Sequence, residues 1–190
     1  MLTCVPEEAF KSGILNKEFH ERLLVDIDAV IEVAGIPPEY LWSRLSEHCR
    51  VDEVEWMKNI RKHTNHGLAL VNGGQKGKPA KPAIDRMMAL TGACLRNYID
   101  SRVMPLQDVL ARLKDDAMPS PTVLMIPNFC LSQNDGGHIA PWQISALLGL
   151  LYSRLSKNLK TVVYVSSLDA VEKAYGESFR QHLEAHFQLD

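Results

Sequence analysis

Residues 67–79 read GLALVNGGQKGKP, and this stretch decides the fold of the chain. The apolar run over residues 67–71 ends abruptly in a segment rich in glycine and lysine. A helical pattern then follows through Met87, Leu90 and Leu95. The order strand, glycine-rich loop and helix is that of a phosphate-binding P-loop, in which backbone N–H groups and a helix N-terminus surround phosphate oxygens.

The signature of such a loop, G-x-x-x-x-G-K-[ST], is only partly present. Asn72 replaces the first glycine but tolerates left-handed backbone angles. Pro79 replaces the hydroxyl residue that holds Mg²⁺, and proline has no backbone N–H for a phosphate. Two interpretations stay open: a basic surface turn without a ligand, and a residual ATP or ADP site that uses no magnesium. The candidate nucleotide-binding residues are Asn72, Gly73, Gly74, Lys76, Gly77 and Lys78.

Two more apolar runs, residues 122–126 and 161–166, predict strands buried on both faces. Buried strands that alternate with helices imply an α/β fold with a parallel sheet. Trp142 opens one of these helices, and we expect it in the core. Helical periodicity predicts helices over residues 16–34, 39–48, 51–63, 107–113, 141–155 and 169–187, with a stop at Gly35 and an interruption near Gly176.

The end of the second strand lacks the acids of an ATPase. In P-loop ATPases, an Asp-Glu pair after the strand handles Mg²⁺ and the attacking water. Here Pro127 and Asn128 occupy these positions, and neither side chain can act as a base. Pro79 likewise has no hydroxyl at the position where the loop signature has Ser or Thr. Both positions that handle magnesium are therefore lost, and we predict no magnesium-dependent ATP hydrolysis.

The order of these motifs resembles the AAA+ ATPases of the DnaC-type helicase loaders and the IstB-type transposition helpers. The segment AGIPPEY at residues 34–40 is similar to the entry of their ATPase domain, and TVVYVSSL at residues 161–168 to their sensor-1 strand. The segment AYGESFRQHL at residues 174–183 resembles their box of trans-acting arginines. The positions that depart from the family pattern are Ser166 and Ser167 at sensor 1, and Ser178, Arg180 and His182 in the arginine box.

The resemblance implies a three-layer P-loop fold without a separate C-terminal lid. It divides the chain into an N-terminal helical segment, residues 1–34, and a degenerate AAA+ domain, residues 35–190. The function it implies is a non-catalytic accessory role in DNA replication or mobile-element biology, acting through a protein partner such as a replicative helicase or a transposition factor. The alternative is an active or weakly active ATPase that oligomerises on DNA as a helicase loader.

A segment of the chain corresponds to the region where the related loaders contact single-stranded DNA. Arginine suits backbone phosphates, but a solvated helix face explains the same residues. Both interpretations stay open. The candidate DNA contacts are Lys81, Arg86, Arg96, Arg102 and Arg112.

The composition excludes several classes of protein. Hydrophobic residues make up 46% and charged residues 23%, as in a globular domain. Lys and Arg total 21 against 23 for Asp and Glu, so a net charge of -2 provides no general basic field for nucleic acid. No apolar stretch approaches the roughly 20 residues that cross a bilayer, and acids stand where a signal peptide carries bases. We therefore predict a cytoplasmic protein with no membrane contact.

The four cysteines form no CxxC pair, so we expect them to be reduced. One group has the residue types of a zinc site but no recognised spacing, and we predict no metal there. Its members are His48, Cys49, His63 and His66.

Overall fold

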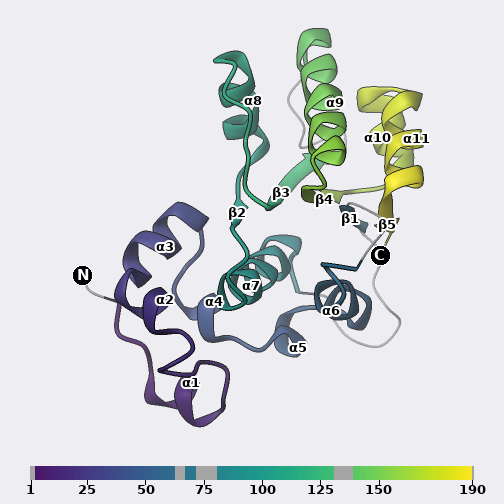
Figure 1. The fold of residues 1–190 in the computed structure, drawn as a ribbon. Helices are drawn as coiled ribbons and strands as arrows, with labels where there is room; N and C mark the ends of the chain where they lie inside the picture. The colour runs from purple at the N-terminus through teal and green to yellow at the C-terminus, as the bar shows by residue number, and fades with distance from the viewer. Residues whose placement is uncertain (1–2, 63–66, 72–80, 131–138, 190) are drawn as a thin grey trace.

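The computed structural model describes residues 3–62, 67–71, 81–130 and 139–189. A parallel sheet with the strand order β2-β3-β4-β1-β5 forms its centre (Figure 1). The predicted α/β class is confirmed. Two short edge strands were not predicted, because three residues carry too little periodicity to be recognised. The strands are β1 (Gly67–Val71), β2 (Ser101–Val103), β3 (Val123–Cys130), β4 (Lys160–Val165) and β5 (Phe187–Leu189).

Helices cover both faces of the sheet and give three layers (Figure 1). One face packs against α6 (Val51–Lys58) and α7 (Ala83–Arg96). Alternate residues of the central strands serve the two layers: Leu68 and Leu70 face α6 and α7, whereas Ala69 faces the opposite layer. That opposite layer consists of α8 (Leu106–Lys114), α9 (Pro141–Ser156), α10 (Leu168–Tyr175) and α11 (Glu177–His186).

The N-terminal segment is more broken than its periodicity predicts. Instead of one helix over residues 16–34, the structure has α2 (Glu21–Val25) and α3 (Ile27–Ala34), separated at Asp26, a poor helix former. The predicted stop at Gly35 is confirmed, because this residue caps α3 in the left-handed conformation, with φ 69°. A further helix, α1 (Glu7–Lys11), precedes them.

The predicted helix over residues 39–48 is also divided, into α4 (Glu39–Trp42) and α5 (Leu45–His48), because Ser43 is extended. α4 lies so close to α7 that a Cβ added to Gly92 would stand 2.1 Å from the carbonyl oxygen of Tyr40. Glycine in the middle of α7 therefore permits this contact. The predicted interruption at Gly176 is confirmed between α10 and α11.

Two expectations about side chains have different outcomes. Trp142 is half exposed at the start of α9, so its expected place in the core is wrong. The cysteines are free thiols, and burial raises the pKa of Cys94 to about 12 and that of Cys130 to about 11. None of the helices in the described ranges is long and apolar enough to cross a membrane.

Candidate functional site

The candidate site is the edge of the sheet where the parallel strands end. Ligands of open α/β sheets bind beyond the carboxyl ends of the strands. Val71, the last residue of β1, pairs with Val165, the last residue of β4, and Cys130 of β3 pairs with the same residue. This edge therefore gathers the β1 end, the Pro127 and Asn128 positions, and the two serines after β4. The predicted nucleotide-binding residues Asn72, Gly73, Gly74, Lys76, Gly77 and Lys78 lie outside the described residues.

Strand β3 does not end at Ile126, as its sequence predicts, but continues through an irregularity. The register shifts between Ile126, which pairs with Val163, and Cys130, which pairs with Val165. Pro127 lies in this bulge, where its missing N–H removes one ladder hydrogen bond. The strand resumes because the Ser166 N–H donates to the carbonyl oxygen of Cys130 at 2.8 Å.

Asn128 stabilises the start of a neighbouring helix. Its Oδ1 accepts a hydrogen bond from the backbone N–H of Leu106 at 2.8 Å. Leu106 is the first residue of α8, and the N–H groups of a first helical turn have no acceptor within the helix. Asn128, which the sequence predicts to stand at the position of an ATPase acid, therefore serves the fold, and the part of β3 beyond Ile126 carries no carboxylate.

Substitutions at Asn128 test this role. We expect Asn128→Ala to lower the free energy of unfolding by about 1 kcal/mol, because the N–H of Leu106 loses its acceptor. Asn128→Asp is the matched control: its carboxylate can still accept, and a negative charge suits a helix N-terminus, so its stability should be at least that of the parent. Urea unfolding of the three proteins measures both values, and equal losses for Ala and Asp would refute the capping role.

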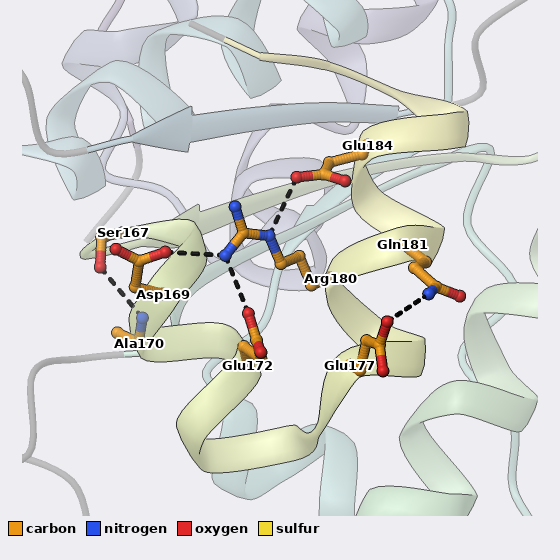
Figure 2. Close-up of polar contacts among 8 residues, drawn as sticks. All are labelled: Ser167, Asp169, Ala170, Glu172, Glu177, Arg180, Gln181 and Glu184. Carbon is orange, nitrogen blue, oxygen red and sulfur yellow. Dashed lines mark hydrogen bonds and ion pairs between the residues drawn. The ribbon is translucent and has the colours of Figure 1, made fainter.

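The two serines after β4 have different roles. Ser167 Oγ accepts from the N–H of Ala170 at 3.0 Å and caps the N-terminus of α10 (Figure 2). The hydroxyl of Ser166 is buried and has no hydrogen-bond partner among the described residues. Of the two residues at the predicted sensor-1 position, Ser167 therefore serves as a helix cap, and Ser166 carries a buried hydroxyl without a hydrogen bond to the described residues.

Arg180 holds α10 and α11 together (Figure 2). Its Nη1 lies 2.7 Å from Asp169 and 2.8 Å from Glu172 on α10, and its Nε lies 3.0 Å from Glu184 on α11. Hydrogen bonds to Glu184, Glu172 and Asp169 raise the pKa of the guanidinium above its usual range. Three acids of the same chain therefore surround the single arginine of the predicted arginine box.

The sequence pattern did not predict these carboxylate partners of Arg180. The spacing of Arg180 and Glu184, four residues apart on one helix, was the available signal. The partners on α10 become visible only once the turn at Gly176 folds the two helices together. The first of the three positions in the predicted arginine box, Ser178, is exposed on α11 and carries no positive charge.

His182 is buried on the inner side of α11. Its ring meets the Tyr152 ring edge-on at 4.7 Å and tilts against the His186 ring at 4.9 Å. Burial lowers the pKa of His182 to about 4, and the neighbouring His186 adds to the effect. At neutral pH the ring is therefore neutral and buried, so it provides no cation for a second molecule.

This buried histidine predicts a pH dependence of stability. In the unfolded chain the His182 ring takes up a proton near pH 6.5, whereas in the folded chain it does so only near pH 4. The unfolded state therefore binds more protons between these values, and stability falls as the pH drops through this window, by about 3 kcal/mol in total. His182→Phe keeps an aromatic ring against Tyr152 but cannot titrate. Urea unfolding from pH 7 to pH 4 should show a weaker pH dependence for this variant, and identical slopes would exclude the effect.

The candidate DNA contacts separate into two groups. Arg86 is buried and forms an ion pair with the buried Glu53, so we remove it from the candidates. Arg96 donates to the carbonyl oxygen of Leu41 at 2.6 Å, and burial lowers the pKa of its guanidinium to about 10, so its charge also serves the fold. The candidates that retain exposure are Lys81 and Arg112, which are exposed, and Arg102, which is half-buried with its Nε 3.6 Å from the Asp100 carboxylate.

The candidate zinc group is only partly within the described residues. Cys49 Sγ donates to the carbonyl oxygen of Arg86 at 3.5 Å, and the His48 ring packs against Tyr40 at 5.3 Å. His63 and His66 lie outside the described ranges. Within those ranges, no three His, Cys, Asp or Glu side chains come together in an arrangement that holds a metal ion.

Comparison with known proteins gives likeness in structure alone. No protein-family model and no curated protein sequence matches the chain. A DnaC helicase loader superposes with a TM-score of 0.53 at 14% identity, covering 80% of this chain and 97% of that one. DnaI gives 0.56 at 12% identity, covering 81% and 89%. A DNA replication initiation factor gives 0.57 at 10% identity, covering 81% of this chain and 50% of that one. These likenesses confirm the predicted fold, a three-layer α/β domain with a central parallel sheet.

Proposed function

We propose that this chain, whose fold is that of the AAA+ helicase loaders, is an accessory protein of DNA replication that binds a protein partner and does not hydrolyse ATP. One observation carries the proposal: the residue at the catalytic acid position, Asn128, uses its side chain to cap α8. An amide cannot take a proton from water, and it replaces the carboxylate that positions magnesium.

The arginine box supports the same conclusion. An arginine that acts on the nucleotide of a neighbouring subunit needs a guanidinium free to meet the phosphates. Arg180 instead contacts Asp169, Glu172 and Glu184 of its own chain. If Arg180 moved away to meet a phosphate, these three carboxylates would lose their positive partner. The contacts therefore favour a structural role for Arg180.

The N-terminal segment carries the surface that we assign to a partner. Phe19, Val25 and Val33 have 61%, 77% and 57% of their surface exposed. Beside Val33 lies a shallow hollow of about 330 Å³, lined mainly by apolar residues of α3 and by Leu95 of α7. Exposed apolar side chains next to a hollow are typical of a protein-docking surface.

Binding to the replicative helicase of the same organism tests the partner proposal. We expect the two proteins to elute together in gel filtration, with or without ATP. Val33→Glu should abolish this co-elution, whereas Val51→Glu, at a valine on α6 that is 70% exposed, should leave it intact. Separate elution of the unmodified proteins, or equal effects of the two substitutions, would refute the proposed surface.

Contact with single-stranded DNA is a secondary part of the proposal. It rests on Lys81 and Arg112, the exposed members of the candidate group. Contacts to phosphates predict binding that depends little on sequence and weakens steeply with salt. Replacing both residues with alanine should reduce the slope of log affinity against log salt by about 1 to 2, and an unchanged slope would exclude them as contacts.

A nucleotide held as a structural ligand is a second candidate, favoured by the buried hydroxyl of Ser166. This group has no partner among the described residues and lies where the strands of the P-loop fold end. A ligand that binds the folded chain raises its melting temperature. ATP or ADP at millimolar concentration, with EDTA in place of magnesium, should raise the Tm if this candidate is correct. An unchanged Tm would eliminate it.

A further inference from the structure

A hollow of about 440 Å³ lies where the start of α2 meets the end of α7. It shares no lining residue with the hollow beside Val33. Two aromatic rings, two acids and one base line it: Phe19, Tyr98, Glu18, Glu21 and Arg22. The rings are open to solvent, since Phe19 is 61% and Tyr98 49% exposed. Exposed rings that line a hollow are typical of a place where a side chain of another molecule binds.

Contacts within the chain hold the two rings in position. The hydroxyl of Tyr98 donates to the carbonyl oxygen of Phe19, and the two rings meet edge to face at 5.5 Å. Between them in the sequence, the buried His20 accepts the N–H of Asn16 on Nδ1 at 2.8 Å. The proton of this ring is therefore on Nε2, which donates to the carbonyl oxygen of Arg96 at 3.1 Å. The hollow is thus formed before any ligand binds, which lowers the entropic cost of binding.

The rings present faces that attract a positive charge. Tyr98 stacks on His20 at 6.3 Å, which covers one face of its ring and leaves the other face for the hollow that it lines. Phe19 meets both of these rings at steep angles, 89° and 68°, so neither lies flat over it. The face of an aromatic ring carries negative potential and attracts a cation within about 6 Å of its centre. The hollow therefore favours a cation over an ordinary apolar side chain.

The acids of the hollow also favour a cation. Glu18 and Glu21 are exposed, and neither forms an ion pair with a described residue. With Arg22, the lining has a net charge of -1. Residues 1–34 contain seven Asp and Glu against three Lys and Arg, whereas the rest of the chain contains 16 against 18. The negative charge of the chain is therefore concentrated in the segment that forms this hollow, and such a field attracts a basic ligand.

We propose that this hollow binds an arginine side chain from a basic segment of the protein partner. The guanidinium would lie over the rings of Phe19 and Tyr98, beside the carboxylates of Glu18 and Glu21. The inference rests on the proposed function, because it states the chemistry of the partner that the N-terminal segment binds. Arginine fits better than lysine, since its planar group stacks on rings and is more weakly hydrated. An apolar or acidic segment would cover the carboxylates without a counter-charge, which is costly.

An NMR titration of the full chain with a short peptide tests the proposal without the partner. The probe is acetyl-Gly-Arg-Gly-Arg-Gly-amide, and the control peptide has citrulline, which is uncharged and similar in shape, in place of both arginines. We expect the ring signals of Phe19 and Tyr98 to shift saturably with the arginine peptide and its affinity to exceed that of the control at least about fivefold. No saturable shift at these rings, or equal affinities of the two peptides, would overturn the proposal.

Charge changes of opposite sign give a sharper test with the same peptide. Glu21→Lys should weaken its binding about fivefold, whereas Arg22→Glu should strengthen it by a similar factor. Glu55→Lys makes the same change as the first variant on the exposed surface of α6 and should leave the affinity unchanged. Phe19→Leu keeps an apolar side chain without a ring and should weaken binding about fivefold. Equal effects of the two lysine substitutions, or unchanged binding by the leucine variant, would contradict the proposal.

Co-elution with the helicase separates this inference from the proposed function. If the helicase co-elutes and Val33→Glu prevents it, but the arginine peptide does not bind, the proposed function holds and the inference is wrong. If the peptide binds at the two rings but the helicase elutes separately, the chemistry of the hollow holds and the helicase is not the partner. Where both bind, Glu21→Lys should also weaken co-elution, and Glu55→Lys should not.

Discussion

Replacing Glu53 with alanine is expected to lower the free energy of unfolding by about 3 to 5 kcal/mol, the largest effect we predict. Glu53 is fully buried and forms an ion pair with Arg86, which is 3% exposed. The same carboxylate accepts the backbone N–H of Arg50 at 2.9 Å and so also caps α6. Without it, the guanidinium of Arg86 would remain inside the protein without this counter-charge.

A double-mutant cycle distinguishes the ion pair from simple loss of volume. We expect Glu53→Leu and Arg86→Met together to cost less than the sum of the two single changes, because no unpaired charge stays buried. Urea unfolding measures the four free energies. A loss below about 1 kcal/mol for Glu53→Ala, or strict additivity in the cycle, would show that the buried pair is not what stabilises this part of the core.

Arg154→Ala is expected to cost about 3 to 4 kcal/mol. The buried guanidinium donates to Thr161 Oγ1 at 2.9 Å and to the carbonyl oxygens of Pro119, Pro121 and Lys160 at 3.0, 3.0 and 2.6 Å. These bonds attach the segment before β3 to the start of β4. Burial lowers the pKa of Arg154 to about 10, so the group stays charged at neutral pH.

Two substitutions serve as controls for Arg154. Thr161→Val removes one of the four hydrogen bonds and should cost about 1 kcal/mol. Arg154→Lys keeps the charge, but an ammonium group lacks the planar fork that reaches several carbonyl oxygens at once, so it should restore less than half of the loss. Equal unfolding free energies for Arg154→Ala and Thr161→Val would contradict this role.

The sequence predicts the central strands and the order of the motifs because these depend on local patterns. The apolar runs of β1, β3 and β4 are buried on both faces, and Gly35 and Gly176 interrupt helices at the expected positions. The strand pairings of β2 and β5 depend on distant residues instead. So does the extension of β3 past Pro127, which needs Val165 of β4 as a partner.

The roles of the site residues were harder to predict, because their side chains contact residues that are remote in sequence. Arg86 fits a solvated helix pattern until Glu53, 33 residues earlier, is placed against it. Asn128 is a plausible strand end in the sequence, and only the position of α8, 22 residues earlier, shows what its amide does. Polar residues of this kind are satisfied by tertiary contacts, which no local periodicity encodes.

Steady-state ATP hydrolysis in the presence of Mg²⁺ is the most direct test of the central claim that the site is not catalytic. We predict no turnover by the purified chain above the rate without protein, with or without single-stranded DNA and the helicase. We also predict that Lys78→Ala has the same background rate and that Asn128→Asp alone restores none. Turnover by the unmodified chain that disappears in Lys78→Ala would contradict the claim and would establish the alternative, an active helicase-loader ATPase with rearranged ligands.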